Sequence, residues 1–143
     1  MLRASLGFTL LELLVVISII AIASAGVAFA IRDSAQTALE REGERLAALL
    51  ETGRALSRTS GQALHWRDTP KGFRFEGANS GKLPQNWLSP HTTVQWDALV
   101  NPRVLTLGPE PIIDPQTVTL VHEGRTLRVG TDGLHPFAIR PGF

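Results

Sequence analysis

The hydrophobic pattern of the first sixty residues changes once along the chain. Residues 8–31 form a continuous apolar run whose one charged side chain is that of Glu12. As a helix, this run would be about 36 Å long, which is enough to cross a hydrocarbon core of roughly 30 Å. Residues 32–60 then place apolar side chains at a nearly helical period, which predicts a helix with one apolar stripe. The stripe consists of Ala38, Leu39, Leu46, Leu49, Leu50 and Leu56.

We therefore expect one helix over residues 9–58, with a membrane-spanning first half and a second half that packs its leucines against a folded domain. Charged side chains fill the other faces of the second half. Three pairs of opposite charge lie three residues apart, namely Arg41/Glu44, Glu42/Arg45 and Glu51/Arg54. Each such pair contributes roughly a few tenths of a kcal/mol on a helix surface. Gly43 and Gly53 leave two explanations open, a bend in the helix or close packing against a neighbouring element.

Beyond residue 60 the chain has the pattern of an antiparallel β domain. All nine prolines lie at or after Pro70, and short β-prone segments alternate with turn residues. The expected strands are 63–67, 73–76, 93–99, 103–107, 117–121, 126–129 and 135–140. Residues 77–90 are rich in Gly, Asn, Ser and Pro and are expected to form a loop. The predicted fold class is α+β, a long N-terminal helix packed on an antiparallel β-sheet or small β-sandwich.

Composition excludes several kinds of chemistry. The chain has no cysteine, which excludes disulfides, zinc–thiolate sites and cysteine nucleophiles. Its 14 Lys and Arg against 13 Asp and Glu give a net charge of +1. A nearly neutral chain lacks the broad positive field that nucleic-acid binding needs, so we expect no nucleic-acid partner.

We find no sequence pattern for catalysis or for a metal site. The chain has four histidines, namely His65, His91, His122 and His135. None has the spacing of metal ligands on one element, and no nucleophile elbow or phosphate-binding loop is present. The three aspartates Asp97, Asp114 and Asp132 lack the spacing of a calcium loop. We therefore expect no enzyme activity, no cofactor and no metal.

Three interpretations of the N-terminal run compete. A secretory signal peptide would end at the A-x-A site of residues 23–25, but Glu12 would then stand in its apolar core. A plain membrane anchor has the right length, yet a carboxylate near the bilayer centre costs about 2.5–3.5 kcal/mol. Cleavage between Gly7 and Phe8 would instead create an α-ammonium group at Phe8, one helical turn from Glu12 and on the same face. Pairing of these charges, within one chain or between neighbours, would remove much of the cost of burying the carboxylate.

The string Gly7-Phe8-Thr9-Leu10-Leu11-Glu12, followed by the apolar run, resembles the N-terminus of type IV pilins and type II secretion pseudopilins. The resemblance implies that a prepilin peptidase cuts between Gly7 and Phe8 and N-methylates Phe8, and that Glu12 guides assembly. The implied domains are a leader peptide at 1–7, a transmembrane assembly helix at 8–31, its periplasmic continuation at 32–60 and a periplasmic β-rich domain at 61–143. Arg3 fits a cytoplasmic leader.

A second resemblance, at the other end of the chain, narrows the family. Residues 104–111, 118–121 and 131–137 resemble the end of H-type minor pseudopilins of type II secretion, the GspH/FimT group, whereas residues 67–101 do not match it. This implies a structural subunit at the tip or upper shaft of a periplasmic pseudopilus on the bacterial inner membrane. The implied partners are the I-, J- and K-type minor pseudopilins, the major pseudopilin, the prepilin peptidase and inner-membrane lipid.

Two other functions stay open at this stage. One is a minor type IV pilin that takes part in pilus assembly or DNA uptake. Residues 112–143 carry three arginines and three acidic residues, a net charge of zero that does not favour phosphate binding. The other is a secreted enzyme whose mature chain would start at Gly26.

Aromatic residues indicate the last candidate site. Trp66 and Trp96 lie on expected strands and are expected in the core. Trp87 lies in the 77–90 loop between Leu83 and Leu88, where an exposed aromatic cluster would suit a partner interface.

Overall fold

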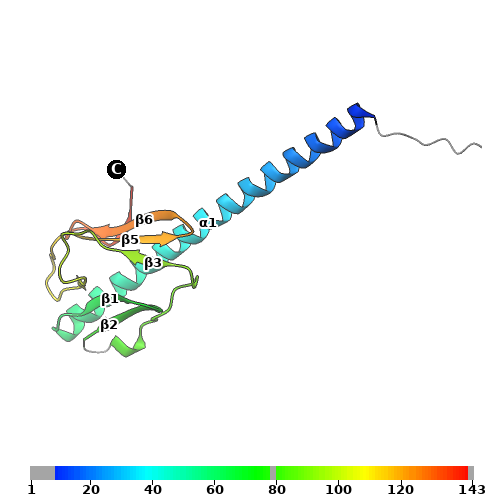
Figure 1. The fold of residues 1–143 in the computed structure, drawn as a ribbon. Coiled ribbons are helices and arrows are strands. Elements are labelled where there is room, and N and C mark those ends of the chain that lie inside the picture. The colour runs from blue at the N-terminus through cyan, green and yellow to red at the C-terminus, as the bar shows by residue number, and fades with distance from the viewer. Residues whose placement is uncertain (1–8, 78–79, 142–143) are drawn as a thin grey trace, which may run out of the picture. The chain divides into compact units, whose positions relative to one another are not determined.

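The computed structural model describes residues 9–77 and 80–141, and the side chains of these residues except 28–33. The chain divides into two compact units, Met1–Ser34 and Ala35–Phe143. One helix runs through the first unit into the second, and the strands all follow it in the chain (Figure 1). The observed architecture is the α+β, pilin-like layout that the sequence predicted.

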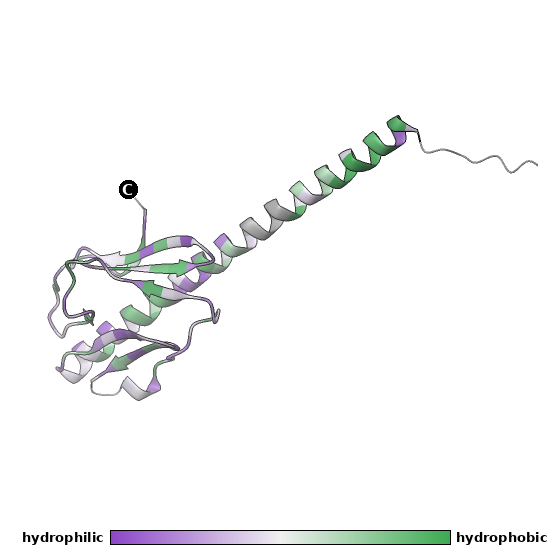
Figure 2. Ribbon diagram, viewed as in Figure 1, coloured by the Kyte–Doolittle hydropathy of each residue, from purple (hydrophilic) through white to green (hydrophobic). Residues whose placement is uncertain are grey.

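Helix α1 spans Leu10–Ser60, 51 residues without a break. Its start agrees with the expected one, and its end lies two residues beyond the expected Arg58. Gly61 follows with φ +66°, the left-handed conformation that commonly ends a helix after its last turn. Hydropathy changes along α1 as the sequence predicted, from an apolar first part to a mixed second part (Figure 2).

Two antiparallel sheets follow the helix. The first has the strand order β2-β1-β4, formed by β2 (Gly72–Glu76), β1 (His65–Thr69) and β4 (Leu105–Thr106). The second has the order β3-β5-β6-β7, formed by β3 (Thr93–Gln95), β5 (Gln116–His122), β6 (Arg125–Thr131) and β7 (Ala138–Arg140). A short 3₁₀ helix, η1 (Ser80–Lys82), interrupts the expected 77–90 loop.

Two pairs of consecutive expected strands form hairpins, β1–β2 and β5–β6, and the β5–β6 turn shows why. Glu123 and Gly124 form its two-residue turn with φ +46° and +75°. Positive φ at both central residues is the backbone that matches the twist of paired strands, and glycine adopts it without strain. The β1–β2 hairpin also has a two-residue turn, Pro70-Lys71, but neither of these residues has positive φ.

Three strands are shorter than expected, and side-chain contacts explain two of them. The 93–99 strand stops at Gln95, because the indole N–H of Trp96 donates to Asp68 of β1 over 2.8 Å. Trp96 is therefore a link between the sheets and not a strand residue. The 135–140 strand begins at Ala138, because Asp132 accepts the backbone N–H of His135 and holds that segment in a turn. The 103–107 strand is reduced to Leu105–Thr106.

The hydrophobic core of the second unit lies between α1 and the two sheets. Leu39, Leu46 and Leu50 of the helix are at most 1% exposed, and Trp66 and Leu120 of the sheets are fully buried. The leucine stripe is thus core packing, as expected, although Leu49 and Leu56 are only partly buried.

The structure shows close packing at the two helical glycines. A β-carbon on Gly53 would lie 2.7 Å from Cδ1 of Leu107 and 3.2 Å from Cδ2 of Leu64. A β-carbon on Gly43 would overlap the side chain of Leu127 on β6. Each glycine lets one part of the β domain approach the helix backbone.

The expectation that the helix charges lie on solvent faces is wrong for several of them. Glu42 is 1% exposed and Arg54 is 3% exposed. The expected pairs Glu42–Arg45 and Glu51–Arg54 both form, each at 3.3 Å. Arg41 and Glu44 form no ion pair within the described residues; both are exposed.

Candidate functional site

The N-terminal end of α1 combines a helix cap with a carboxylate. Thr9 precedes the helix, and its hydroxyl accepts the backbone N–H of Glu12 over 3.2 Å. This is the bond that a threonine N-cap makes to the third helical residue, and the Thr-x-x-Glu spacing is that of a capping box. Glu12 also lies in the first turn, where the helix dipole favours a negative charge. The cap was missed in the sequence analysis, although the spacing carries its signal.

The expected cleavage site itself, Gly7 and Phe8, lies outside the described residues. The described residues begin at Thr9, and Glu12 is exposed within the first unit. Its carboxylate therefore makes no contact with another described part of the chain, which leaves it available to a group from outside.

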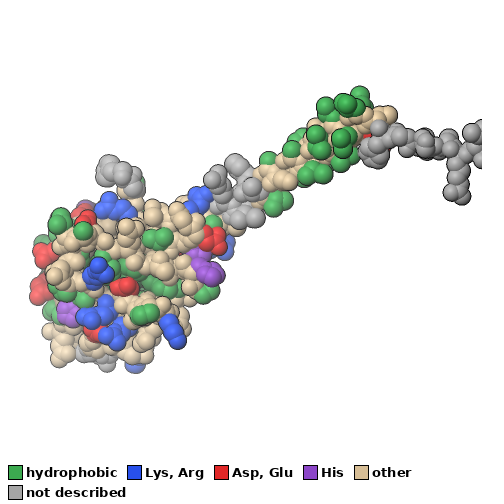
Figure 3. All heavy atoms as spheres, in the orientation of Figure 1, with side chains coloured by type: hydrophobic (Ala, Val, Ile, Leu, Met, Phe, Trp, Pro, Cys, Tyr) green, Lys and Arg blue, Asp and Glu red, His purple; other side chains and the backbone are tan. Residues whose placement is uncertain are grey.

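The surface of the helix after Glu12 is apolar on every side. Leu10–Val27 has a mean hydropathy of 2.5, and none of it is buried within the chain. The hydroxyl of Ser18 donates to the carbonyl of Leu14 over 2.7 Å, so its hydrogen bond is made within the helix. Hydrophobic side chains cover the visible face of this segment (Figure 3). By length and composition the segment can span a membrane once.

Comparison with known protein families decides the character of this end of the chain. Residues 2–28 match the prokaryotic N-terminal methylation motif. This motif is type IV prepilin-like, and it points to a structural subunit and not an enzyme. It indicates processing by a prepilin peptidase and assembly with other pilin-like subunits. No curated protein matches the chain significantly, and no solved structure does either.

The methylation motif and the apolar helix belong to one candidate site. The second candidate, the expected interface of Leu83, Trp87 and Leu88, differs from the expectation. Leu83 is only 9% exposed and belongs to the core, so it offers no surface to a partner. Trp87 is half-buried, and its ring lies 4.6 Å from that of Phe73 in an edge-on contact. Leu88 alone of the three is exposed, at 60%. The loop folds back on the domain because its aromatic side chain gains more from burial than from exposure.

A buried carboxylate fixes this loop on the helix. Glu42 accepts the backbone N–H of Leu88 over 2.7 Å and that of Ser89 over 3.3 Å. Arg45, its ion-pair partner, donates to the carbonyl of Asn86 over 2.8 Å. Charge-assisted bonds to backbone groups are among the stronger ones in proteins, so the pair sets the conformation of residues 86–89.

A second charged pair holds the C-terminal segments in the same way. Glu51 accepts the backbone N–H of Phe137 over 2.9 Å, and Arg54 donates to the carbonyl of Pro111 over 3.2 Å. The sequence gives no sign of these bonds, because their partners lie 86 and 57 residues away along the chain.

The titratable groups that the sequence singled out do not gather into a metal site. Within the described residues, no group of three or more His, Asp or Glu side chains lies close enough to hold a metal ion. His122 is buried on β5, and its Nδ1 has no hydrogen-bond partner in the part of the chain that the structure describes. Asp132 accepts the backbone N–H of His135 over 2.8 Å and its imidazole over 2.7 Å, and these bonds lower the pKa of Asp132 well below its usual range. Asp132 and Gly133 form a turn, with Gly133 at φ +92°.

Proposed function

We propose that this chain is a minor pseudopilin, an H-type (GspH/FimT-like) structural subunit at the tip or upper shaft of the type II secretion pseudopilus, where it supports protein export across the outer membrane. The observation that carries the proposal is the methylation motif at residues 2–28, which leads into an exposed apolar helix. An apolar helical segment that buries none of its side chains within its own chain is stable only in lipid or against other subunits.

The charge arrangement at the start of the helix supports assembly as its purpose. In this proposal the prepilin peptidase cuts between Gly7 and Phe8 and methylates Phe8, and Glu12 then pairs with an α-ammonium group of its own or a neighbouring chain. The capping bond from Thr9 holds the backbone of Glu12 in the helix. The pairing offsets the cost of placing the carboxylate in an apolar surrounding.

The second unit supports a structural role. Residues 35–143 form one compact unit around the second part of α1, which the proposal places in the periplasm as the continuation of the helix (32–60) and the β-rich domain (61–143). The transmembrane segment 8–31 anchors the chain in the inner membrane. The proposed partners are the I-, J- and K-type minor pseudopilins and the major pseudopilin.

The charge of the second unit supports secretion over DNA uptake. On its visible face, basic and acidic side chains are interspersed, and no continuous basic surface appears there (Figure 3). A subunit that binds DNA needs clustered cations, because phosphate contacts dominate its affinity. The alternative, a minor type IV pilin, is kept as an outcome of the test below.

Deletion of the gene tests the proposal. We expect exported proteins to accumulate in the periplasm, while surface pili and DNA uptake stay at the wild-type level. Complementation with the wild-type chain should restore export. Normal export together with a loss of pili or of DNA uptake would reject the pseudopilus and favour the minor pilin.

A further inference from the structure

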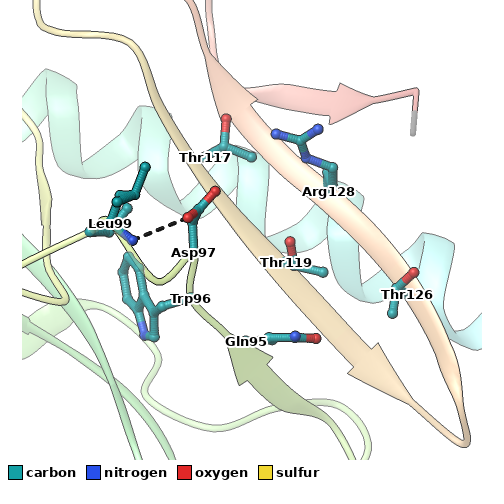
Figure 4. A pocket seen from close by; sticks show the side chains of 9 residues that line it. Gln95, Trp96, Asp97, Leu99, Thr117, Thr119, Thr126 and Arg128 are labelled. Atoms are coloured by element: carbon teal, nitrogen blue, oxygen red, sulfur yellow. Dashed lines mark hydrogen bonds between the residues drawn. The ribbon is translucent and has the colours of Figure 1, made fainter. Parts of the chain in front are cut away.

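A groove lies beside β5, at the point where β3 ends. Its volume is about 550 Å³. Threonine side chains and Arg128 line its floor on β5 and β6, and the segment that follows β3 forms the opposite wall (Figure 4). The lining residues are Gln95, Trp96, Asp97, Leu99, Val100, Thr117, Thr119, Thr126 and Arg128.

The groove exists because the chain turns away from β5 after Gln95. The indole of Trp96 is held by Asp68 of the other sheet, over 2.8 Å. Asp97 then closes a turn, since its carboxylate accepts the N–H of Leu99 over 3.1 Å and its carbonyl accepts that of Val100 over 3.0 Å. The β5 strand continues past this point to Gln116, so part of its edge has no neighbouring strand.

The register of the hairpin identifies which backbone groups are open. His122 and Arg125 flank the two-residue turn and form a hydrogen-bonded pair, so every second residue back from His122 bonds to β6. The residues between them direct their N–H and C=O groups to the other side. There β3 pairs as far as Gln95 with Thr119. The N–H and C=O of Thr117 therefore face the groove without a partner strand among the described residues.

A positive charge without a partner lies in the same groove. Arg128 is directly opposite Thr119 and also directly opposite Arg140 on β7. Arg140 contacts Asp132 at 3.8 Å and donates to the carbonyl of Gly130 over 3.3 Å. Arg128 forms no hydrogen bond or ion pair with any residue that the structure describes. Two adjacent cations on one face repel each other, and a bound anion relieves that repulsion.

We propose that this groove binds an extended segment of a partner protein that carries an aspartate or glutamate. Its main chain pairs with the N–H and C=O of Thr117, as an added strand does at an open sheet edge. Its carboxylate contacts Arg128, on the side of the groove away from Asp97, whose own charge repels it. Leu99, which is 92% exposed on the rim, covers an apolar side chain of the segment. The inference does not rest on the proposed function.

Peptide binding to the full chain in detergent micelles tests this inference. The probes are acetyl-Thr-Val-Glu-Val-Thr-amide and its matched control with Gln in place of Glu, titrated into ¹⁵N-labelled protein and followed by amide chemical shifts. We expect saturable shifts centred on Thr117, Thr119 and Arg128, and slower hydrogen exchange at the Thr117 amide. The Glu peptide should bind about fivefold more tightly than the Gln peptide, the usual worth of a partly exposed ion pair.

Two substitutions separate the contacts. Arg128→Gln should weaken the Glu peptide about fivefold and leave the Gln peptide unchanged. Thr117→Pro removes the N–H that faces the groove while the ladder to β6 keeps its bonds, and it should abolish binding of both peptides. Thr117→Ala keeps that N–H and should bind as the wild type does. The spectrum without peptide shows whether each variant is folded. If Thr117→Pro does not fold, Arg128→Gln still tests the proposal.

Three results of the peptide titrations would each overturn the inference. They are the absence of saturable shifts at Thr117 and Arg128, equal affinity of wild-type protein for the two peptides, and an Arg128→Gln variant that binds the Glu peptide as tightly as the wild type does. Shifts at these same amides that depend on protein concentration alone would assign the groove to a second copy of the chain, and would also overturn it.

Discussion

Glu12 contributes a backbone group to the helix cap and a carboxylate, and substitutions of its side chain test the carboxylate alone. Its backbone N–H bonds to the hydroxyl of Thr9 in the helix cap, and its carboxylate is proposed to pair with an α-ammonium group. Glu12→Gln keeps the helix start and a polar side chain but removes the charge. If pairing drives assembly, Glu12→Gln and Glu12→Ala should both lose about 3 kcal/mol or more of assembly free energy, more than a hundredfold in filament incorporation. Membrane insertion should stay intact or improve in both.

Fractionation of membranes and sheared filaments measures both quantities for the Glu12 variants. Ser18→Ala is the control, because it changes a polar group on the same helix whose bond is internal. Normal incorporation of Glu12→Gln would show that the charge is not needed for assembly.

Glu42 is the residue whose loss should affect the folded domain most directly. Glu42→Ala leaves the amides of Leu88 and Ser89 without their acceptor and removes the ion-pair partner of Arg45. We expect a loss of about 2–4 kcal/mol in the free energy of unfolding, the range for charge-assisted bonds whose partners stay unsatisfied. Urea unfolding of the detergent-solubilised chain, followed by the fluorescence of Trp66, Trp87 and Trp96, measures it.

The control for Glu42 lies two residues along the same helix. Glu44 is exposed and forms no ion pair within the described residues, so Glu44→Ala should change stability by less than about 0.5 kcal/mol. Equal effects of the two substitutions would mean that Glu42 does not anchor the loop.

At the scale of elements, the two parts of α1 have different surfaces. Its first part exposes apolar side chains on all faces, and its second part buries one stripe under two sheets. The glycines of the second part are contact points, since Gly43 meets Leu127 of β6 and Ile139 of β7 where a larger residue would not fit. The helix and the sheets are therefore packed together closely. A larger side chain at these glycines would force a neighbouring strand to move.

Gly43→Val tests this packing. The added side chain would collide with Leu127, and we expect a loss of about 1–3 kcal/mol in the free energy of unfolding despite the removal of a glycine from a helix. Ala48→Val places the same side chain on the exposed face of the helix and should cost only about 0.5 kcal/mol. The urea titration used for Glu42 compares them, and similar midpoints for both variants would contradict close packing at Gly43.

At the scale of the whole molecule, proteolytic processing determines the N-terminal residue and the net charge of the mature protein. Removal of residues 1–7 takes away Arg3 and leaves 13 basic and 13 acidic side chains. We expect the mature chain to begin at Phe8 with one added methyl group on its α-nitrogen, as the prepilin-like motif implies; this start, unlike one at Gly26, retains the apolar helix and Glu12. Intact-mass measurement of membrane-purified protein and sequencing of its N-terminal peptide check this.

The processing site can be tested against its nearest rival. A Gly7→Val variant should remain unprocessed, because the bulky side chain occupies the cleavage position. A mature chain that begins at Gly26 would instead identify residues 1–25 as a secretory signal, and would contradict membrane anchoring and the pilin-like role together.

The sequence alone determined the features that depend on neighbours along the chain. The apolar run, the leucine stripe, the β-prone segments between turn residues and the glutamate at the start of the helix are local patterns, and the structure confirms the α+β layout that they predict. The prepilin-like motif at residues 2–28 is local in the same sense, because a peptidase reads a short segment.

Only the tertiary structure decided which polar and aromatic residues are buried. Glu42 and Arg54 looked like surface charges, and they are interior anchors because their backbone partners come from loops far along the chain. Leu83 looked like an interface residue and lies in the core, because the loop folds back over Phe73. The groove at Thr117 exists because Trp96 bonds to the other sheet. Each of these outcomes depends on contacts between distant segments, which hydrophobic periodicity does not encode.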